Sequence, residues 1–529
     1  MNTKTTKAWK QYEAGCEYKR RIGLYEKVRL NERFLRGDQW QGSEGDLPKP
    51  VFNILRRIVD YMICTVYSKK VAIHYIDDDM PYIGDEAKAK KIREGINLLS
   101  KNAAYRWEKC KMDKTVRRAL YDAAISGDGV IYSYFDPDAH GAFPYKGDIV
   151  CENIDNVNLF VADVNKADIQ SQEYIILAGR QSVNSLRDEA HKYGMSRAEA
   201  ERLIVSDEER SLGAGDMAMC ELDGDDDEKK ATYLIKFWRE GGRVCFEKSL
   251  KNCVIRRTKT ACHLYPVAYF NWYPTKNSFH GTSPITGLIP NQKFINRGYA
   301  MVMKHMTDTA FSKVIYDKTR IPEWTNEVGE AIAAVGATNV SDAVSIIEPG
   351  KLEEGYMELL ANSISTTKEM MGATEAALGN LNPTNTSAIL AIQEASKVPL
   401  LQIKDNVCGF AEDIANIWAD MMCAYYPADR LIPYFEGSEV NSEKADLSLL
   451  KDTLVTSHVE ISDPERFSVA YNQSVLDRLL DGGYISFTEY LERLPQGIII
   501  DREELIAKRK IEEIIKTEEN YGREENDAR

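Results

Sequence analysis

A helical pattern begins at Pro284 and continues as Ile285-Thr-Gly-Leu-Ile-Pro-Asn-Gln-Lys-Phe-Ile-Asn-Arg-Gly-Tyr-Ala-Met-Val-Met-Lys-His-Met-Thr-Asp308, to about Ala310. At 100° per residue, its apolar side chains fall on one face and its basic side chains on the opposite face. We therefore expect a long amphipathic helix here. The apolar face holds Ile285, Leu288, Ile295, Tyr299, Val302 and Met306, and the basic face holds Lys293, Arg297 and Lys304.

A second helical pattern, at 353–378, carries the complementary charges. Glu354, Glu358, Ser365 and Glu369 repeat the spacing of Lys293, Arg297, Lys304 and Asp308. In an antiparallel pair, Lys304 then meets Glu358 and Lys293 meets Glu369. Exposed ion pairs contribute only about 0–1 kcal/mol each, so these would set the register more than the stability. The same register places Asp308 opposite Glu354, so the helices splay there or the register differs; two ordinary amphipathic helices give the same pattern.

The segment between these helices predicts a compact insert. Phe311-Ser-Lys-Val-Ile-Tyr-Asp317 and Val344-Ser-Ile-Ile347 have the composition of strands. The stretch 322–335 between them opens with proline, as many helices do. We expect a strand–helix–strand unit.

After the second helix comes an uncharged loop, Gly379-Asn-Leu-Asn-Pro-Thr-Asn-Thr-Ser387, and then a third helical pattern that reaches Tyr425. Its roughly 39 residues would span about 58 Å at 1.5 Å per residue. Pro399 removes one backbone hydrogen bond from this helix and predicts a kink near Ser396. Beyond the kink, a packing face repeats every three or four residues, at Ile403, Val407, Phe410, Ile414, Ile417 and Met421.

This order of elements resembles the tailed-phage portal proteins, in which stem, clip, stem, tunnel loop and long kinked helix follow one another. Short sequence segments carry the same resemblance, at Gly281-Thr-Ser-Pro-Ile-Thr-Gly-Leu-Ile-Pro-Asn-Gln292 and at Asn385-Thr-Ser-Ala-Ile-Leu-Ala-Ile-Gln393. It continues at Asn31-Glu-Arg-Phe-Leu-Arg-Gly-Asp-Gln-Trp40 and Val51-Phe-Asn-Ile-Leu55. The likeness extends over nearly the whole chain and rests on order and spacing.

The resemblance implies an α+β, mainly helical fold with portal architecture. It divides the chain into an α/β wing at 1–283, a stem helix at 284–310, a clip at 311–350 and a returning stem helix at 351–378. The tunnel loop follows at 379–387, the long kinked helix at 388–425, a return to the wing at 426–464 and a helical crown at 465–529.

The resemblance also implies a function. A portal is a ring, here expected to be a dodecamer, through which double-stranded DNA enters and leaves the phage head. Its partners would be the major capsid and scaffolding proteins, the large terminase and the head–tail adaptor. The chain would be made in the host cytoplasm, reside at the portal vertex of the virion, carry no cofactor and catalyse no reaction.

Composition is compatible with this expectation. The chain has 529 residues, 43% hydrophobic and 28% charged, which is typical of globular proteins with several domains. No apolar run reaches the 18 or so residues that a membrane helix needs. The ten cysteines are dispersed without a Cys-x-x-Cys motif, which favours reduced thiols. The net charge of −14 argues against a protein that grips DNA by neutralising phosphates, but suits a conduit that must let DNA slide.

The region before Pro284 predicts a mixture of helices and strands. Residues 1–36 hold an excess of six positive charges on a helical pattern, either a solvated face or a docking arm for capsid or scaffold. Further helices are expected at 52–69, 85–111 and 113–126, with one or two short ones at 182–211. Strands are expected at 71–76, 130–135, 148–152, 157–161, 173–180, 231–239, 243–248 and 265–270. After the long helix we expect a loop to about 456, a strand at 457–461 and helices at 465–481 and 486–494.

A second class of function starts from the carboxylates Asp77, Asp78 and Asp79. Enzymes that process nucleic acids hold Mg²⁺ with carboxylates, but usually from separate elements that converge. Three consecutive side chains point in different directions, and no phosphate loop or nucleophile elbow occurs in the sequence. A metal-dependent enzyme is therefore the alternative, and another ring-forming virion adaptor is the third possibility.

Two groups of residues are candidates for contact with DNA. In the tunnel loop, Asn380, Asn382, Asn385 and Thr386 could exchange weak hydrogen bonds with passing phosphates. The basic strip of Lys293, Arg297 and Lys304 either faces DNA or is neutralised by Glu354, Glu358 and Glu369 of the same or a neighbouring subunit. The matched spacing favours neutralisation.

Overall fold

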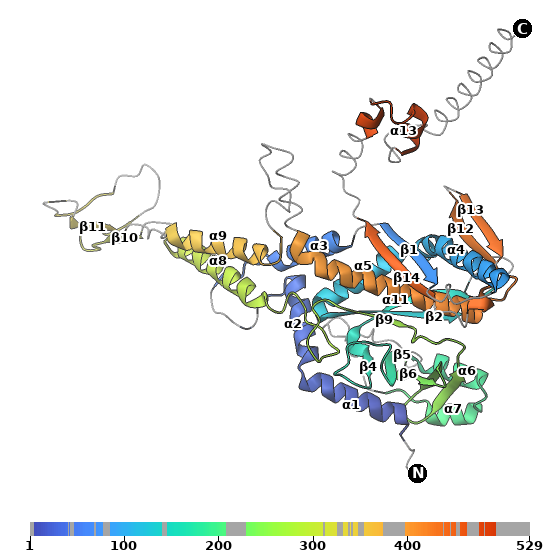
Figure 1. The fold of residues 1–529 in the computed structure, drawn as a ribbon. Helices are drawn as coiled ribbons and strands as arrows, with labels where there is room; N and C mark the ends of the chain where they lie inside the picture. The colour runs from blue at the N-terminus through green and yellow to red at the C-terminus, as the bar shows by residue number, and fades with distance from the viewer. Residues whose placement is uncertain are drawn as a thin grey trace, which may run out of the picture.

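The computed structural model describes residues 5–40, 42, 47–67, 70–77, 85–139, 145–207, 229–309, 313–324, 332–336, 339, 342–347, 354–373, 397–436, 439–444, 446–450, 455–462, 476–480 and 482–493. The fold is mixed α and β. Figure 1 shows a body of helices and sheets from which one pair of helices projects.

The N-terminal part of the body is helical. The basic N-terminal pattern forms two helices instead of one, because Gly23 adopts the left-handed conformation (φ +66°) and turns the chain between them. The other helices predicted before the first sheet are all present. The bounds are α1 Lys7–Arg21, α2 Leu24–Arg36, α3 Ile54–Val66, α4 Glu86–Lys109 and α5 Met112–Ser126.

Two antiparallel sheets follow. A three-stranded sheet has the order β3-β2-β9, and a five-stranded sheet has the order β4-β5-β6-β7-β8. Two short helices, α6 Val183–Lys192 and α7 Arg197–Leu203, lie between β5 and β6 in sequence. The strands are β2 Asp128–Asp136, β3 Asp148–Ile154, β4 Leu159–Val161, β5 Tyr174–Ser182, β6 Lys230–Glu240, β7 Arg243–Ser249, β8 Val254–Lys259 and β9 Val267–Asn271.

The main core forms around one long helix, α11 Leu401–Tyr425. The predicted packing face of this helix is confirmed, since Ile403, Val407, Phe410, Ile414, Ile417 and Met421 are all buried. The helix packs against the three-stranded sheet and against β14 Val455–Ser462, which pairs antiparallel with β1 Lys70–Asp77.

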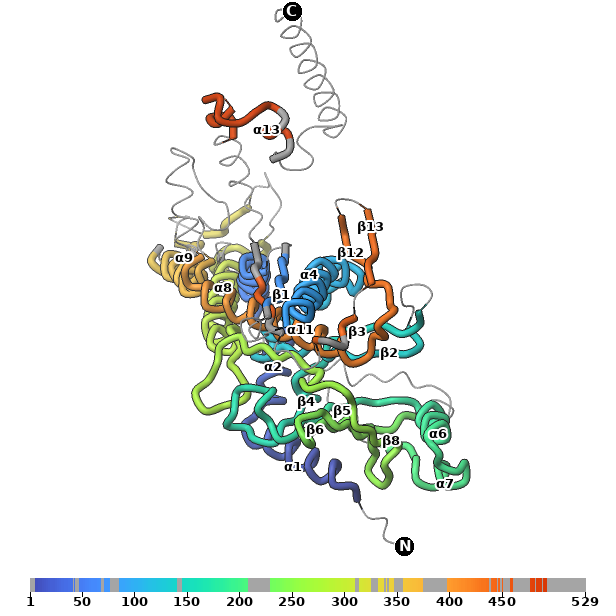
Figure 2. The backbone as a smooth tube through the Cα atoms, turned by 45° about the vertical axis from the view of Figure 1, so that its right-hand side comes forward, coloured from blue at the N-terminus to red at the C-terminus, as the bar shows by residue number. Residues whose placement is uncertain are grey.

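The five-stranded sheet forms a second part of the body and is packed on both of its faces. In Figure 2 this sheet lies between α1 and the strand β2. One of its faces packs against Tyr265, Val267 and Tyr269 around β9, and the opposite face receives Trp9 and Tyr12 of α1. The two sheets and α1 therefore form successive layers.

The projecting pair consists of α8 Ile289–Thr309 and α9 Glu354–Glu369. At its far end lies an antiparallel hairpin of β10 Lys313–Tyr316 and β11 Val344–Ile347, as both strand patterns predicted. The helix predicted at 322–335 is wrong for the residues that the structure describes. Residues 322–324 and 332–335 are not helical, and the Val335 backbone N–H donates to the carbonyl of Arg320 instead.

Four further predictions need correction. The predicted loop before residue 456 contains a hairpin of β12 Leu431–Glu436 and β13 Glu439–Lys444 and the short 3-10 helix η7 Leu447–Leu450. Strand β8 was not predicted. Met306, expected on the apolar packing face of the helix α8, is 58% exposed, whereas Ile295 and Val302 on that face are buried. The helix begins at Ile289 and not near Pro284, and Ile285 and Leu288 are buried in the turn before it.

Beyond β14, the structure describes residues 476–480, which are helical, and α13 Phe487–Arg493. Both lie within predicted helices. The assignment of 465–529 to a crown stays a prediction.

Candidate functional site

The projecting pair is held together where the side chain of Leu360 on α9 packs closely on the backbone of Gly298 on α8. A Cβ atom on Gly298 of α8 would lie 2.4 Å from Cδ2 of Leu360 on α9, so only glycine fits there without rearrangement. On one side of this contact, Asn291 Nδ2 donates to Thr367 Oγ1 at 3.2 Å. On the other side, the Tyr356 hydroxyl lies 3.5 Å from Met301 Sδ. The antiparallel pairing predicted for the two helices is therefore present.

The register of the pair differs from the predicted one. Asn291–Thr367 and Gly298–Leu360 place Lys304 at the level of Glu354, one helical turn from Glu358. The packing of Leu360 against Gly298 fixes this register, because burying a leucine outweighs exposed ion pairs. The prediction that Lys304 meets Glu358 within one chain is therefore wrong by four residues.

The strip residues themselves have local contacts. Lys304 Nζ forms an ion pair with Asp308 at 3.3 Å, and Lys293 Nζ lies 5.6 Å from the centre of the Phe34 ring. Glu369 accepts a hydrogen bond from Ser365 at 2.9 Å, and Arg297 and Glu358 are exposed. Neutralisation of the basic strip by the acidic residues of a neighbouring subunit stays a prediction.

The base of the pair is fixed to the body by a buried amide network. Gln292 Nε2 donates to the carbonyl of Phe52 at 2.6 Å, and its Oε1 accepts from the backbone N–H of Ile54 at 3.1 Å. Asn296 Nδ2 donates to Gln39 Oε1 at 2.6 Å. Both α8 amides are at least 97% buried, so each lost partner would leave a costly unsatisfied group. This network sets the direction in which the pair leaves the body.

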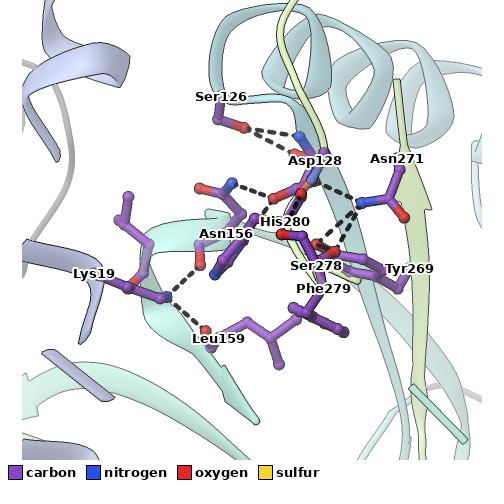
Figure 3. Close-up of polar contacts among 12 residues, drawn as sticks. Lys19, Ser126, Asp128, Asn156, Leu159, Tyr269, Asn271, Ser278, Phe279 and His280 are labelled. Carbon is purple, nitrogen blue, oxygen red and sulfur yellow. Dashed lines mark hydrogen bonds and ion pairs between the residues drawn. The ribbon is translucent and has the colours of Figure 1, made fainter. Parts of the chain in front are cut away.

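The chain that leads into α8 is anchored on Asp128 (Figure 3). This fully buried carboxylate accepts from the Gly281 backbone N–H at 2.7 Å and from Asn271 Nδ2 at 2.8 Å through Oδ1. Its Oδ2 accepts from His280 Nδ1 at 2.8 Å and from Asn156 Nδ2 at 3.0 Å. One side chain at the start of β2 thus joins Asn156, Asn271 and the segment 280–281.

A buried lysine continues this network toward α1. Lys19 is 2% exposed, and its ammonium donates to the carbonyls of Asn156, Val157 and Leu159 at 2.6–2.9 Å. It also lies 4.0 Å from the centre of the Phe160 ring. Burial lowers the pKa of Lys19 to about 7, with Cys16 and Asp155 opposing the shift. The lysine therefore ties α1 to the segment that carries Asn156.

This pKa predicts a pH dependence of stability. Between about pH 7 and pH 10.5 the unfolded chain binds a proton at Lys19 that the folded chain does not, so folding becomes more favourable as pH rises through this range. Lys19→Met should abolish this contribution. We expect the melting temperature of wild type relative to Lys19→Met to increase from pH 7 to pH 10. A difference that stays constant over this range would contradict the shifted pKa.

A second buried network holds the far end of α11. Arg106 Nη1 and Asp148 Oδ1 form an ion pair at 3.0 Å, and the Tyr426 hydroxyl donates to the same carboxylate oxygen at 2.8 Å. Burial alone would raise the pKa of Asp148, but Arg106 and hydrogen bonds from Lys109 and Tyr426 hold it well below its usual range. The network joins α4, β3 and the end of α11.

The remaining predicted site residues lie in three places. The tunnel-loop residues Asn380, Asn382, Asn385 and Thr386 lie outside the described residues, as do Asp78 and Asp79. Asp77 ends β1, opposite Val455. Pro399 lies in the short 3-10 turn η6 Val398–Leu400, directly before α11 begins.

Two further properties concern metal ions and membranes. Within the described ranges, His, Cys, Asp and Glu side chains do not gather in groups of three or more that could hold a metal ion. Among the helices described, none combines the length and the apolar content that a bilayer crossing requires.

Comparison with known protein families gives one match, over a stretch that includes the projecting pair. Residues 255–433 match the family model described as phage P22-like portal protein. Over this stretch the chain is similar to the portal proteins of tailed phages. A comparison with curated proteins gives no match.

The portal match covers the part of the chain on which the resemblance mainly rested. It begins in β8, includes α8, the hairpin, α9 and α11, and ends in β12. Sequence reasoning missed Asp128, His280 and Lys19, which connect this portal region to the rest of the body. The signal available for Asp128 was its place between Gly127 and Gly129, which indicated only a turn.

Proposed function

We propose that this chain is the ring-forming portal of a tailed phage, the conduit for double-stranded DNA during packaging and ejection. The observation that carries the proposal is the projecting pair α8–α9, which extends from the body on a buried amide base within the region of the portal match. In a ring of such chains the pairs would line the channel wall. The family is generally structural, so no catalysis is assigned to the chain.

Apolar side chains on the projecting pair support assembly with further copies. Phe294, Met301 and Met306 of α8 and Leu359 of α9 are each between 49% and 58% exposed. Contiguous exposed apolar surface commonly marks a protein–protein interface. We infer that neighbouring copies cover this surface in a ring, which we expect to contain twelve subunits.

The two ends of the pair would have different partners. The β10–β11 hairpin exposes Ile315 and Ile346 at its tip, where the large terminase and later the head–tail adaptor would dock. The broader body would contact the major capsid and scaffolding proteins. The uncharged loop 379–387 would project into the channel and touch the passing DNA.

The loop role can be tested by adding charge to it. Asn382→Lys with Asn385→Lys would place two new cations per subunit in the channel, which would hold phosphates instead of releasing them. We expect DNA packaging to slow by roughly ten-fold at low salt and to recover partly at high salt, because salt screens such contacts. The measurement is the rate at which nuclease-protected DNA accumulates in heads assembled with each variant.

The matched control is Asn382→Ser with Asn385→Ser, which keeps the loop neutral and polar. Its packaging rate should stay close to that of wild type. Packaging by the lysine variant at the wild-type rate in low salt would contradict contact between the loop and DNA.

A further inference from the structure

A cavity of about 480 Å³ opens between the two sheets, away from the projecting pair. Its walls come from β2, from β6, β7 and β8, from the segment after β8 and from the end of α11. Aromatic rings dominate the lining: Tyr132, Tyr134, Phe135, Phe237, Phe246 and Tyr425. A cavity of this size and composition is typical of a ligand pocket.

The cavity lies against one face of the five-stranded sheet. Phe237, Phe246 and Thr258 are cross-strand neighbours on β6, β7 and β8, so their side chains share that face. All three line the cavity. Side chains of any strand added beside β8 would therefore alternate between the cavity and the opposite face.

Strand β8 is the last strand of its sheet, and no other strand that the structure describes pairs with its outer edge. The backbone N–H of Thr260 donates to the carbonyl of Val244, so the alternation of hydrogen-bonded pairs directs the N–H groups of Arg257 and Lys259 outward. The outward backbone groups of β8 make no hydrogen bond to any residue that the structure describes. An open edge of this kind is a template for pairing with another extended chain.

The edge is also cationic. Val254-Ile-Arg-Arg-Thr-Lys259 contains three cations and no acid, in a chain whose net charge is −14. Arg256 lines the cavity, where it accompanies Phe246 and bonds to the Tyr193 hydroxyl, and Lys259 lines its rim. Arg257 lies over Trp238 on the opposite face, where Glu247 of β7 is its cross-strand neighbour. Within the described part of the chain, none of the three cations forms an ion pair.

We propose that β8 and the adjoining aromatic cavity form a binding site for an extended acidic peptide. The peptide would add to the sheet as a sixth strand, place an aromatic or branched apolar side chain in the cavity and set acidic side chains near Arg257 and Lys259. Its sequence would alternate between apolar and acidic residues. This inference does not depend on ring assembly.

The chemistry of the edge disfavours two other occupants. A second copy of β8 would bring three further cations beside the first three, and like charges directly opposite one another are destabilising. A single-stranded nucleic acid would use the rings and the cations but not the row of backbone N–H and C=O groups. Cations on an edge strand also discourage aggregation. If that were the only role of these cations, no peptide would bind selectively to the edge.

The test uses wild-type full-length protein and fluorescein-labelled hexapeptides, with binding measured by fluorescence anisotropy. The probe is Glu-Phe-Glu-Val-Glu-Thr. Replacing its three glutamates with lysine should weaken binding by about ten-fold or more, because the charge is reversed. Replacing its phenylalanine with serine should weaken binding by a similar factor, because the apolar anchor is lost. Equal affinity for the acidic and basic peptides, or tighter binding of an oligothymidine of six nucleotides, would overturn the proposal.

Backbone pairing has its own test in two N-methylated forms of the probe. One form carries methyl groups on the glutamate amides and the other on the phenylalanine, valine and threonine amides. A strand added to β8 turns only one of these sets toward the sheet. One form should therefore lose binding by about ten-fold or more while the other stays within about two-fold of the probe. Equal sensitivity of both forms, or of neither, would overturn strand addition.

Protein variants locate the site. Thr258→Trp fills the cavity from the exposed strand and should abolish binding of the probe. Arg257→Pro removes one outward N–H and should bind about five-fold more weakly than Arg257→Gln, which loses the same charge but keeps the N–H. Unchanged binding by Thr258→Trp would place the peptide elsewhere and overturn the assignment.

Discussion

Replacing Gly298 with valine is expected to separate the two projecting helices and to abolish ring assembly. Even the first added carbon would lie 2.4 Å from Leu360 Cδ2, and valine adds two more methyl groups at the same point. Overpacking of this kind costs about 1–3 kcal/mol per chain. Because each copy in a ring contributes a pair to the wall, the misfit would recur at every subunit. The measurement is the fraction of purified chain in the ring peak on gel filtration.

Gly355 provides a matched control on the partner helix. A Cβ added there meets no atom within 4 Å, so Gly355→Val introduces the same side chain into the same helix pair without a clash. Its ring fraction should equal that of wild type. If both variants assembled normally, the close approach at Gly298 would have no role in assembly.

Replacing Arg106 with alanine should produce the largest loss of stability. The side chains of Arg106 and Asp148 are 5% and 9% exposed, so removing one ion leaves the other buried without its partner. Breaking a buried pair in this way costs about 3–5 kcal/mol. Equilibrium unfolding in urea would measure the effect. Lys109→Ala is the control, because Lys109 contacts the same carboxylate from a side chain that is 35% exposed and should cost no more than about 1 kcal/mol.

The same network predicts the direction of a pH effect. The folded pKa of Asp148 is depressed from 3.8, so its contribution to stability is present above about pH 4 and is lost as pH falls through the folded pKa. Asp148→Asn should therefore lose stability at pH 7, and its difference from wild type should shrink below pH 4. A difference that stays constant down to the acid limit of folding would contradict this.

The parts of the fold that could be predicted have one strong periodic signal. The packing face of α11 repeats through Ile403, Val407 and Phe410 because one side of that helix is buried along its length. The apolar face of α8 was found in the same way, and both strands of the tip hairpin were found from their composition. The register of α8 on α9 was not, because it depends on the single contact of Gly298 with Leu360, whereas the charge spacing was compatible with more than one register.

Other elements were missed because their local signal was weak or misleading. Strand β8 carries cations where a buried strand would carry apolar residues, since it lies at the sheet edge. The strand β12 was missed within a predicted loop; it contains Pro433, which is tolerated because β12 pairs with β13 alone. Asp128 and Lys19 act through contacts between segments more than 100 residues apart, and no local pattern reports such contacts.

The most direct test of the proposed function is the state of the purified full-length chain in electron micrographs and by native mass spectrometry. We predict rings with a central hole, of about 720 kDa for twelve copies of the 60.0 kDa chain, with the α8–α9 pairs around the hole. A uniform population of 60.0 kDa monomers under all assembly conditions would contradict it.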